Sequence, residues 1–312
     1  MNKTALLFAG QGAQVVGMGR DMAEASSSAR QWFEQADQAL GCDLSRICFQ
    51  GPEADLTRTE YAQPGIYLVG WVAFQLLKER LPGLDFHATA GLSLGEFTAL
   101  AAAGVFSFED GIRVVRQRGR FMQEACEAQS GGMAAIIGLD EESTRAVCEL
   151  TGATLANLNC PGQIVISGPA SVMEKACEAA RSAGAKKAMP LKVAGAYHSP
   201  LMAPAQPSLK AALARVSFSA PIVPTLSNVT AMPHDPTQVS SRLVEQVTAP
   251  VRWEACMRWM LQNGYTRFIE LGPGKALSGF MKRIDDKVQM LNVSDMASLE
   301  TTVQALSASP NP

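Results

Sequence analysis

The sequence has little excess charge of either sign and no long apolar run. Its 27 lysines and arginines are balanced by 29 aspartates and glutamates, for a net charge of −2. Proteins that bind nucleic acid or an anionic membrane through charge usually carry a marked basic excess. The most apolar segment, residues 66–77, is shorter than the roughly 20 residues that span a bilayer and indicates a buried helix. We therefore expect neither nucleic acid nor a membrane as a partner.

The sequence also lacks paired cysteines and clustered metal ligands. Its seven cysteines form no C-x-x-C pair, and no His/Cys/Asp/Glu cluster shows ligand spacing. An odd number of cysteines disfavours a disulfide framework and favours a reducing compartment. We therefore expect a cytoplasmic protein without a metal site. Histidine is scarce as well, with three in 312 residues, so candidates for a catalytic base are few.

What the sequence does contain is an alternation of short β-type runs with helical patterns. This alternation predicts an α/β domain with a largely parallel sheet. The predicted strands are residues 4–8, 88–90, 223–226, 267–271 and 288–293. The predicted helices are residues 30–40, 64–81, 94–103, 108–126, 253–263, 276–284 and 299–306.

The middle of the chain follows a different order. Strand-like residues 132–137, 154–159, 163–167 and 186–192 alternate with helix-like residues 141–151 and 171–183. The resulting order, β-α-β-β-α-β, is that of a ferredoxin-like, or split βαβ, unit. We therefore predict a large α/β domain from residues 1–128 and 195–312, with an inserted ferredoxin-like subdomain at residues 129–194. The cleft between the two is the expected binding site.

One strand-to-helix turn, Gly91-Leu92-Ser93-Leu94-Gly95-Glu96, suggests a nucleophile. A serine between two glycines at such a turn is a nucleophile elbow. The small flanking residues allow the tight turn, and the helix N-terminus places backbone N–H groups beside the hydroxyl. Because glycine and serine share many ordinary turns, this motif alone leaves both an acylated Ser93 and a plain turn open.

A serine nucleophile needs a base, and histidine is the usual one. His87 begins the strand that leads to the turn, and we expect it to have a structural role. His234 lies in a proline-rich segment that we expect to be an exposed loop. His198 lies where the inserted unit rejoins the large domain, at the mouth of the expected cleft. By elimination His198 is the candidate base.

Two further segments are suited to such a site. The turn Gly10-Gln11-Gly12 follows a predicted strand, and its glycines allow backbone N–H groups to point into a site, as an oxyanion hole requires. It is not a phosphate loop, because no G-K-[ST] follows. Arg116, Arg118 and Arg120 lie on the helix after the elbow helix. Three such arginines usually form a solvated face, but a buried one would be suited to bind a carboxylate through its planar fork.

Several separated segments together resemble a known family. They are Gly10-Gln11-Gly12-Ala13-Gln14, Gly91-Leu92-Ser93-Leu94-Gly95-Glu96, Arg118-Gly119-Arg120-Phe121-Met122-Gln123, Asn159-Cys160-Pro161-Gly162-Gln163, Gly195-Ala196-Tyr197-His198-Ser199-Pro200-Leu201-Met202, Pro250-Val251-Arg252-Trp253 and Glu270-Leu271-Gly272-Pro273-Gly274-Lys275. Through them the chain resembles the malonyl-CoA:acyl carrier protein transacylases of fatty-acid synthesis and the acyltransferase domains of polyketide synthases. The segments occur in order over nearly the whole chain. The resemblance implies a hydrolase-like α/β domain with a ferredoxin-like insert.

The resemblance also implies a reaction and the residues that perform it. Ser93 would attack the thioester of malonyl-CoA and hold malonate as an ester. His198 would take the serine proton and return it to the leaving thiolate. Arg118 would bind the free carboxylate of malonate, and the backbone N–H groups of Gln11 and Leu94 would form the oxyanion hole.

Other positions carry over in the same way. In the family a backbone carbonyl, here that of Gln246, orients the histidine in place of an aspartate. Asn159 would line the pocket. Leu92 stands where many members have histidine, a difference that we interpret as tuning. Tyr197 stands where malonyl-selective members usually have phenylalanine, and a flat aromatic ring there favours a small α-position on the acyl group.

The implied partners are malonyl-CoA and the 4′-phosphopantetheine arm of an acyl carrier protein. Coenzyme A would enter as substrate, no cofactor would be needed, and the protein would be a monomer. Fatty-acid and polyketide synthesis both stay open, as do malonyl and methylmalonyl groups. An acidic carrier would dock on a basic surface near the cleft. Candidates for that surface are Arg116, Arg120, Lys186, Lys187 and Lys275.

Three other classes of protein are alternatives. An acyl hydrolase of the same fold that edits carrier proteins would share the elbow, but it handles acyl groups without the carboxylate that Arg118 would bind. A serine hydrolase of the α/β type normally carries its histidine near the chain end, after an acid, and beyond His198 this chain has only His234. A non-catalytic carrier-binding module would have little need for Ser93, His198 and Arg118 together.

Overall fold

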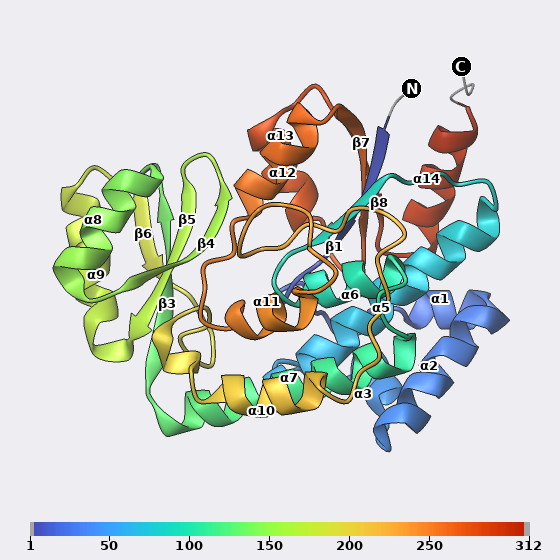
Figure 1. Cartoon of the computed structure of the whole chain (residues 1–312), viewed down its shortest axis with the longest axis horizontal. Coiled ribbons are helices and arrows are strands. Elements are labelled where there is room, and N and C mark those ends of the chain that lie inside the picture. Colours follow the sequence, from blue (N-terminus) through green and yellow to red (C-terminus); the bar gives the residue numbers. More distant parts are fainter. Residues whose placement is uncertain (1–2, 309–312) are drawn as a thin grey trace. The chain divides into compact units, whose positions relative to one another are not determined.

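The structure, a computed structural model, describes residues 3–308 and contains two compact units (Figure 1). The first unit comprises Met1–Gly119, Val216–Leu226 and Met260–Pro312. The second unit comprises Arg120–Arg215 and Ser227–Trp259. Within residues 3–308, no helix combines the length and apolarity that crossing a membrane requires.

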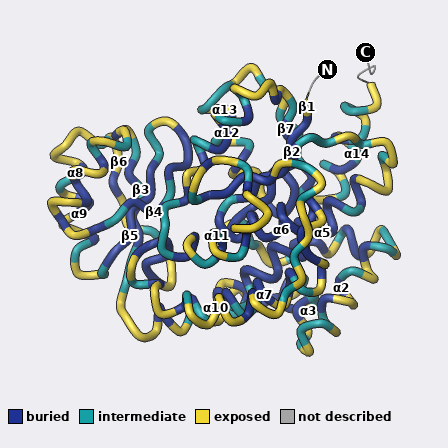
Figure 2. Tube along the Cα trace, in the orientation of Figure 1, coloured by how far each residue is buried: buried dark blue, intermediate teal, exposed yellow. Residues whose placement is uncertain are grey.

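The first unit is built on a four-stranded parallel sheet. Its strands lie in the order β2 (Ala88–Gly91), β1 (Lys3–Phe8), β7 (Tyr265–Leu271) and β8 (Gln289–Val293). Strands of a covered parallel sheet are apolar on both faces, and residues 5–8 of β1 are fully buried (Figure 2). Phe8 pairs in register with Gly91 and Leu271, so the loops after these strands leave the sheet at one edge. Ligands of open α/β sheets bind at this carboxyl edge.

The helices of the first unit begin and end at residues that satisfy their backbone groups. Ser26 accepts the Ala29 N–H at the start of α2, and Gly41, in the left-handed conformation, ends that helix. Helix α5 is buried on nearly every side, as expected for a helix that is apolar all round. The helices are α1 (Arg20–Ala25), α2 (Ser27–Leu40), α3 (Leu44–Gln50), α4 (Glu53–Leu56), α5 (Thr59–Arg80), α6 (Leu94–Ala102), α13 (Ala276–Ile284) and α14 (Met296–Ser307).

The second unit contains an antiparallel sheet with the order β4-β5-β3-β6. Its strands are β3 (Gly131–Ile137), β4 (Thr154–Cys160), β5 (Gln163–Pro169) and β6 (Lys187–Pro190). With α8 (Glu141–Thr151) and α9 (Ala170–Ser182) between them, they form the ferredoxin-like β-α-β-β-α-β unit. Outside this ferredoxin-like part, the second unit also holds the short helix η1 (Pro200–Met202), α10 (Ala205–Leu213) and α11 (Val239–Glu245). Helices α7 (Phe108–Ala128) and α12 (Trp253–Gln262) each have residues in both units.

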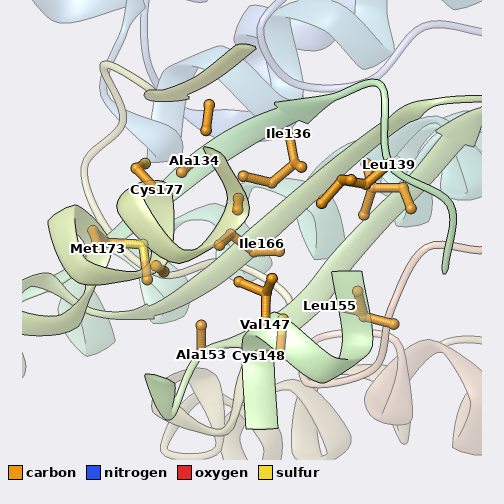
Figure 3. Packing of buried hydrophobic residues seen from close by; sticks show 14 of the residues in the cluster. Ala134, Ile136, Leu139, Val147, Cys148, Ala153, Leu155, Ile166, Met173 and Cys177 are labelled. Atoms are coloured by element: carbon orange, nitrogen blue, oxygen red, sulfur yellow. The ribbon is translucent and has the colours of Figure 1, made fainter. Parts of the chain in front are cut away.

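The core of the antiparallel sheet lies on the face that α8 and α9 cover (Figure 3). Alternate residues of a strand point to the same face. On this face Ala134 and Ile136 of β3 are fully buried, as is Ile166 of β5. Cys148 of α8 and Cys177 of α9 are buried in the same cluster. The cluster consists of apolar side chains, alanines and thiols only, so its role is packing.

The fold class predicted from the sequence is confirmed. The helices predicted at residues 141–151 and 276–284 have those bounds in the structure. The strand predicted at residues 223–226 is wrong: the segment forms only isolated bridges, one of them between Thr225 and Thr89. The domain boundaries at 128/129 and 194/195 stay a prediction. The compact units divide the chain at other residues, and the second extends well beyond the ferredoxin-like unit.

Candidate active site

Ser93 lies at the turn between β2 and α6 in an unusual backbone conformation. Its φ is 52° and its ψ is −105°, a combination that non-glycine residues rarely adopt and that the surroundings must hold. A Cβ on Gly91 would lie 1.9 Å from the Gly95 carbonyl, and a Cβ on Gly95 would lie 2.2 Å from the Phe8 carbonyl oxygen. Only glycines therefore fit on either side of the turn. This geometry is that of a nucleophile elbow.

Arg118 of α7 brings a buried positive charge to Ser93. Its side chain is 1% exposed. Its Nη2 donates a hydrogen bond of 3.1 Å to Ser93 Oγ, and its Nη1 donates one of 2.7 Å to Gln63 Oε1. The guanidinium carbon also lies 5.4 Å from the centroid of the Phe97 ring, a cation–π distance. The guanidinium is thus held in one place beside the serine hydroxyl.

Gln63 is part of the site although the sequence analysis did not single it out. It lies on α5, is fully buried, and donates from Nε2 to Gln11 Oε1 at 3.1 Å. A chain of side-chain contacts therefore runs from Gln11 through Gln63 and Arg118 to Ser93. The predicted helix began one residue later, at position 64. A glutamine in the first turns of an otherwise apolar helix is the signal that could have pointed to it.

Backbone N–H groups of two predicted residues are available as donors. A Cβ on Gly10 would lie 2.4 Å from the Leu92 carbonyl oxygen, so the loop after β1 packs directly against the elbow. Within residues 3–308, neither the Gln11 N–H nor the Leu94 N–H has a protein acceptor. Leu94 is the first residue of α6, where helical N–H groups lack intrahelical partners. Such donors are suited to a developing oxyanion.

His198 belongs to the second unit and is fixed through one ring nitrogen. Its Nδ1 lies 2.9 Å from the carbonyl oxygen of Gln246 and 3.2 Å from that of Ala249. Because carbonyl oxygens only accept, these contacts assign the proton of the neutral ring to Nδ1. Nε2 then carries the lone pair that a base needs. The side chain is 4% exposed, and its backbone is left-handed, with a φ of 58°.

The predicted site residues fall into two sets according to the unit that holds them. Ser93, Arg118, Gln11, Leu94 and the partly exposed Leu92 are in the first unit. His198, Gln246, Asn159 and Tyr197 are in the second. Asn159 and Tyr197 are buried, at 6% and 7% exposure.

A cavity in the second unit involves none of the predicted site residues. It measures 410 Å³ and lies among residues of the α8 N-terminus, the turn between β4 and β5, and the start of α12, such as Asp140, Pro161 and Arg258. Arg258 is already paired with Glu254 at 2.7 Å. Within residues 3–308, no group of three or more histidine, cysteine, aspartate or glutamate side chains is placed to hold a metal ion. All seven cysteines are free thiols.

The structure also separates Arg118 from its neighbours on α7. Arg116 donates to the Leu40 carbonyl oxygen and to Cys42 Sγ, and Arg120 forms an exposed ion pair with Glu124. Arg118 is therefore the buried member of the three arginines.

The other two histidines, His87 and His234, have different surroundings. His87 accepts the Thr4 N–H on Nδ1 at 3.2 Å, next to the start of β1. The exposed loop expected around His234 is present, since residues 235–238 are exposed, but the histidine itself is buried, at 7% exposure. Proline and aspartate around it indicated a surface turn, but the turn folds the histidine inward.

With this geometry in view, comparisons with known proteins identify the family. Residues 5–301 match the family model described as acyl transferase domain. The chain belongs to the acyl transferase family. The malonyl CoA-acyl carrier protein transacylase of Bacillus subtilis is 43% identical over an alignment of 312 positions that covers 98% of each chain.

Solved structures of acyl transferases agree over the same length. The acyl-carrier-protein-S-malonyltransferase from Bartonella henselae has a TM-score of 0.93 and 41% identity, covering 98% of this chain and 100% of that one. A second structure is described as a type II PKS acyl-carrier protein in complex with its malonyl-transacylase. It has a TM-score of 0.93 and 36% identity, covering 97% of this chain and 100% of that one.

Proposed function

We propose that this protein transfers a malonyl group from malonyl-CoA to the pantetheine thiol of an acyl carrier protein, through an ester on Ser93. The observation that carries the proposal is the 3.1 Å hydrogen bond from Arg118 Nη2 to Ser93 Oγ. A malonyl ester carries its free carboxylate one methylene beyond the ester carbonyl. A guanidinium beside Oγ is therefore within reach of that carboxylate and can bind it through two parallel hydrogen bonds. An acetyl ester offers no such partner.

The proposed first half-reaction forms the ester. Ser93 Oγ attacks the thioester carbonyl while Nε2 of His198 takes the hydroxyl proton. The N–H groups of Gln11 and Leu94 stabilise the negative charge on the carbonyl oxygen. The C–S bond then breaks, and the protonated His198 gives its proton to the coenzyme A thiolate. The products are malonyl-Ser93 and free coenzyme A.

The proposed second half-reaction reverses the roles. The carrier thiol gives its proton to His198 and attacks the ester carbonyl, and Ser93 recovers the proton as it leaves. Atoms and charges balance with coenzyme A thioester as substrate, so no further cofactor is required. The B. subtilis relative and the solved complex, which are named for malonyl transfer and for an acyl carrier protein, support this choice of substrate and partner. We further propose that the enzyme acts as a cytoplasmic monomer.

Intact-mass spectrometry of the protein with malonyl-CoA, alone and with an acyl carrier protein, tests the proposal. We expect a malonyl adduct on the protein that passes to the carrier. Ser93→Ala removes the nucleophile and should lower transfer by about 10⁴-fold or more. Rapid release of free malonate without a loaded carrier would instead show a hydrolase of this family. A malonyl adduct on the Ser93→Ala protein would contradict the serine mechanism.

A further inference from the structure

The loop that carries His198, residues 195–199, is tightly constrained within the second unit. His198 has a φ of 58°, which a non-glycine residue keeps only where its surroundings enforce it. Ser199 Oγ donates a 2.7 Å hydrogen bond to the Ala196 carbonyl oxygen, which closes the loop on itself. A Cβ on Gly131 of β3 would lie 2.6 Å from the Ala196 Cβ, so the sheet packs directly against the loop.

Cys126, near the C-terminal end of α7, packs against the other end of the same loop. A Cβ on Gly195 would lie 2.3 Å from Cys126 Sγ and 2.9 Å from Cys126 Cβ. Position 195 therefore has no room for a side chain while position 126 is a cysteine. The backbone that leads into His198 is in contact with this one thiol.

Cys126 also has a polar contact with the residue next to His198. The Tyr197 hydroxyl donates a hydrogen bond to the Cys126 thiol. Burial raises the pKa of Cys126 to about 11, so the group is a neutral thiol in the physiological range. Sulfur is a weak acceptor, but Tyr197 is 7% exposed, so this contact is shielded from water. The contact therefore ties Tyr197 to α7.

We propose that Cys126 is a positioning residue for His198: its thiol holds the Tyr197 hydroxyl and packs on Gly195, so that the loop presents the histidine in one orientation. The inference rests on the proposed function, in which His198 is the base. It assigns to Cys126 no contact with substrate. Losing the thiol should therefore slow proton transfer at Ser93 while leaving the binding of malonyl-CoA largely intact.

A double-mutant cycle tests the coupling between the two side chains. We would measure the single-turnover rate constant for malonyl-Ser93 formation, and KM, for the wild type, Cys126→Ala, Tyr197→Phe and the double variant. We expect about a fivefold loss of rate for Cys126→Ala and about threefold for Tyr197→Phe, with KM within about twofold. The double variant should lose about fivefold, not the roughly 15-fold product, because each single change already removes the contact that the two side chains share. Cys126→Ser, whose hydroxyl also accepts, should keep most of the rate.

Cys148→Ala is the matched control. Cys148 is a buried thiol of the same unit, 4% exposed against 7% for Cys126, with its pKa likewise raised to about 11. It lies in the cluster between α8 and the sheet (Figure 3). Its replacement should leave the rate constant unchanged. Multiplicative losses in the double variant, an equal loss in Cys148→Ala, or losses that disappear once activity is corrected for the folded fraction would overturn the proposal. A wild type that forms no malonyl-Ser93 would overturn the proposed function instead.

Discussion

Ser93 and His198 share a left-handed backbone, with φ values of 52° and 58°, but different contacts hold them there. Around Ser93 the close contacts are between backbone atoms, where Gly91 and Gly95 leave no room for a Cβ. These contacts depend on no side chain, so they tolerate side-chain changes nearby but no added atom on either glycine.

Around His198 the contacts involve side chains. Cys126 packs on Gly195, the Ser199 hydroxyl bonds the Ala196 carbonyl, and Nδ1 of the ring bonds two carbonyls. A loop held by side chains can be adjusted by single substitutions. The comparison therefore indicates that the proposed nucleophile is placed rigidly, whereas the orientation of the proposed base is open to tuning.

The largest effects on stability are expected from adding a methyl group at Gly95, beside Ser93, and at Gly195, in the loop that carries His198. Gly95→Ala places a Cβ 2.2 Å from a backbone oxygen, and we expect a loss of about 3 kcal/mol in the free energy of unfolding. Gly195→Ala should also destabilise, but Cys126→Ala in the same protein should restore part of the loss. Urea unfolding measures both. Gly83→Ala, where a Cβ would meet nothing within 4 Å, is the control. No recovery in the Gly195→Ala/Cys126→Ala protein would show that the two loops are held alike.

Removing the guanidinium separates selectivity from proton transfer. Arg118→Ala should cost about 1.5–3 kcal/mol of transition-state binding, or roughly 10- to 150-fold in kcat/KM for malonyl transfer. Acetyl transfer should stay equal or improve, because acetate has no carboxylate to bind. Arg113→Ala, an exposed position on the same helix, should change neither rate. Equal losses with both acyl groups would assign Arg118 a structural role.

The strain at the two left-handed residues can be compared directly. Alanine keeps the Cβ that the backbone conformation disfavours, whereas glycine adopts positive φ freely. Ser93→Gly should therefore be more stable than Ser93→Ala by about 1 kcal/mol, and His198→Gly more stable than His198→Ala by a similar amount. Urea unfolding of the four variant proteins measures this difference. A difference at one position only would show that the strain is not shared.

A helix cap that belongs to neither loop should give the smallest effect. Asp295 accepts the Ser298 N–H at 2.7 Å at the start of α14, and Asp295→Ala should cost about 1 kcal/mol without loss of transfer activity. The hydrogen bond from the Ser298 side chain lowers the pKa of Asp295 from its ordinary 3.8. The stabilisation that the Asp295 carboxylate provides is therefore present above its ordinary pKa of 3.8. It is lost as the pH falls through the lower pKa of the folded state. Unfolding of both proteins at pH 7 and at about pH 2.5 should show the difference shrinking in acid.

The sequence predicted the long elements better than the short ones. The helix at residues 276–284 has an apolar face repeated over its roughly two and a half turns, and its bounds agree with the structure. The helices Arg20–Ala25, Leu44–Gln50 and Glu53–Leu56 were not predicted, because a helix of one or two turns shows too little periodicity. Tertiary packing, which the sequence does not display, stabilises them.

Side-chain partnerships were harder to predict than the candidate residues themselves. Glycine spacing around Ser93 indicated the elbow, since only a tight turn requires it. The burial of Arg118 and its hydrogen bond to Ser93 depend on how α7 packs. Three arginines at alternate positions of the sequence did not reveal which of them is buried. Gln63 and Cys126 were missed for the same reason. Their importance arises from neighbours far away in the chain.

Peptide carbonyls, rather than a carboxylate, accept the Nδ1 hydrogen of His198. A carbonyl carries only a partial charge, so it stabilises a protonated imidazole less than a full anion would. In the proposed reaction, the histidine would then release its proton more readily, to the coenzyme A thiolate in the first half-reaction and to the Ser93 oxygen in the second.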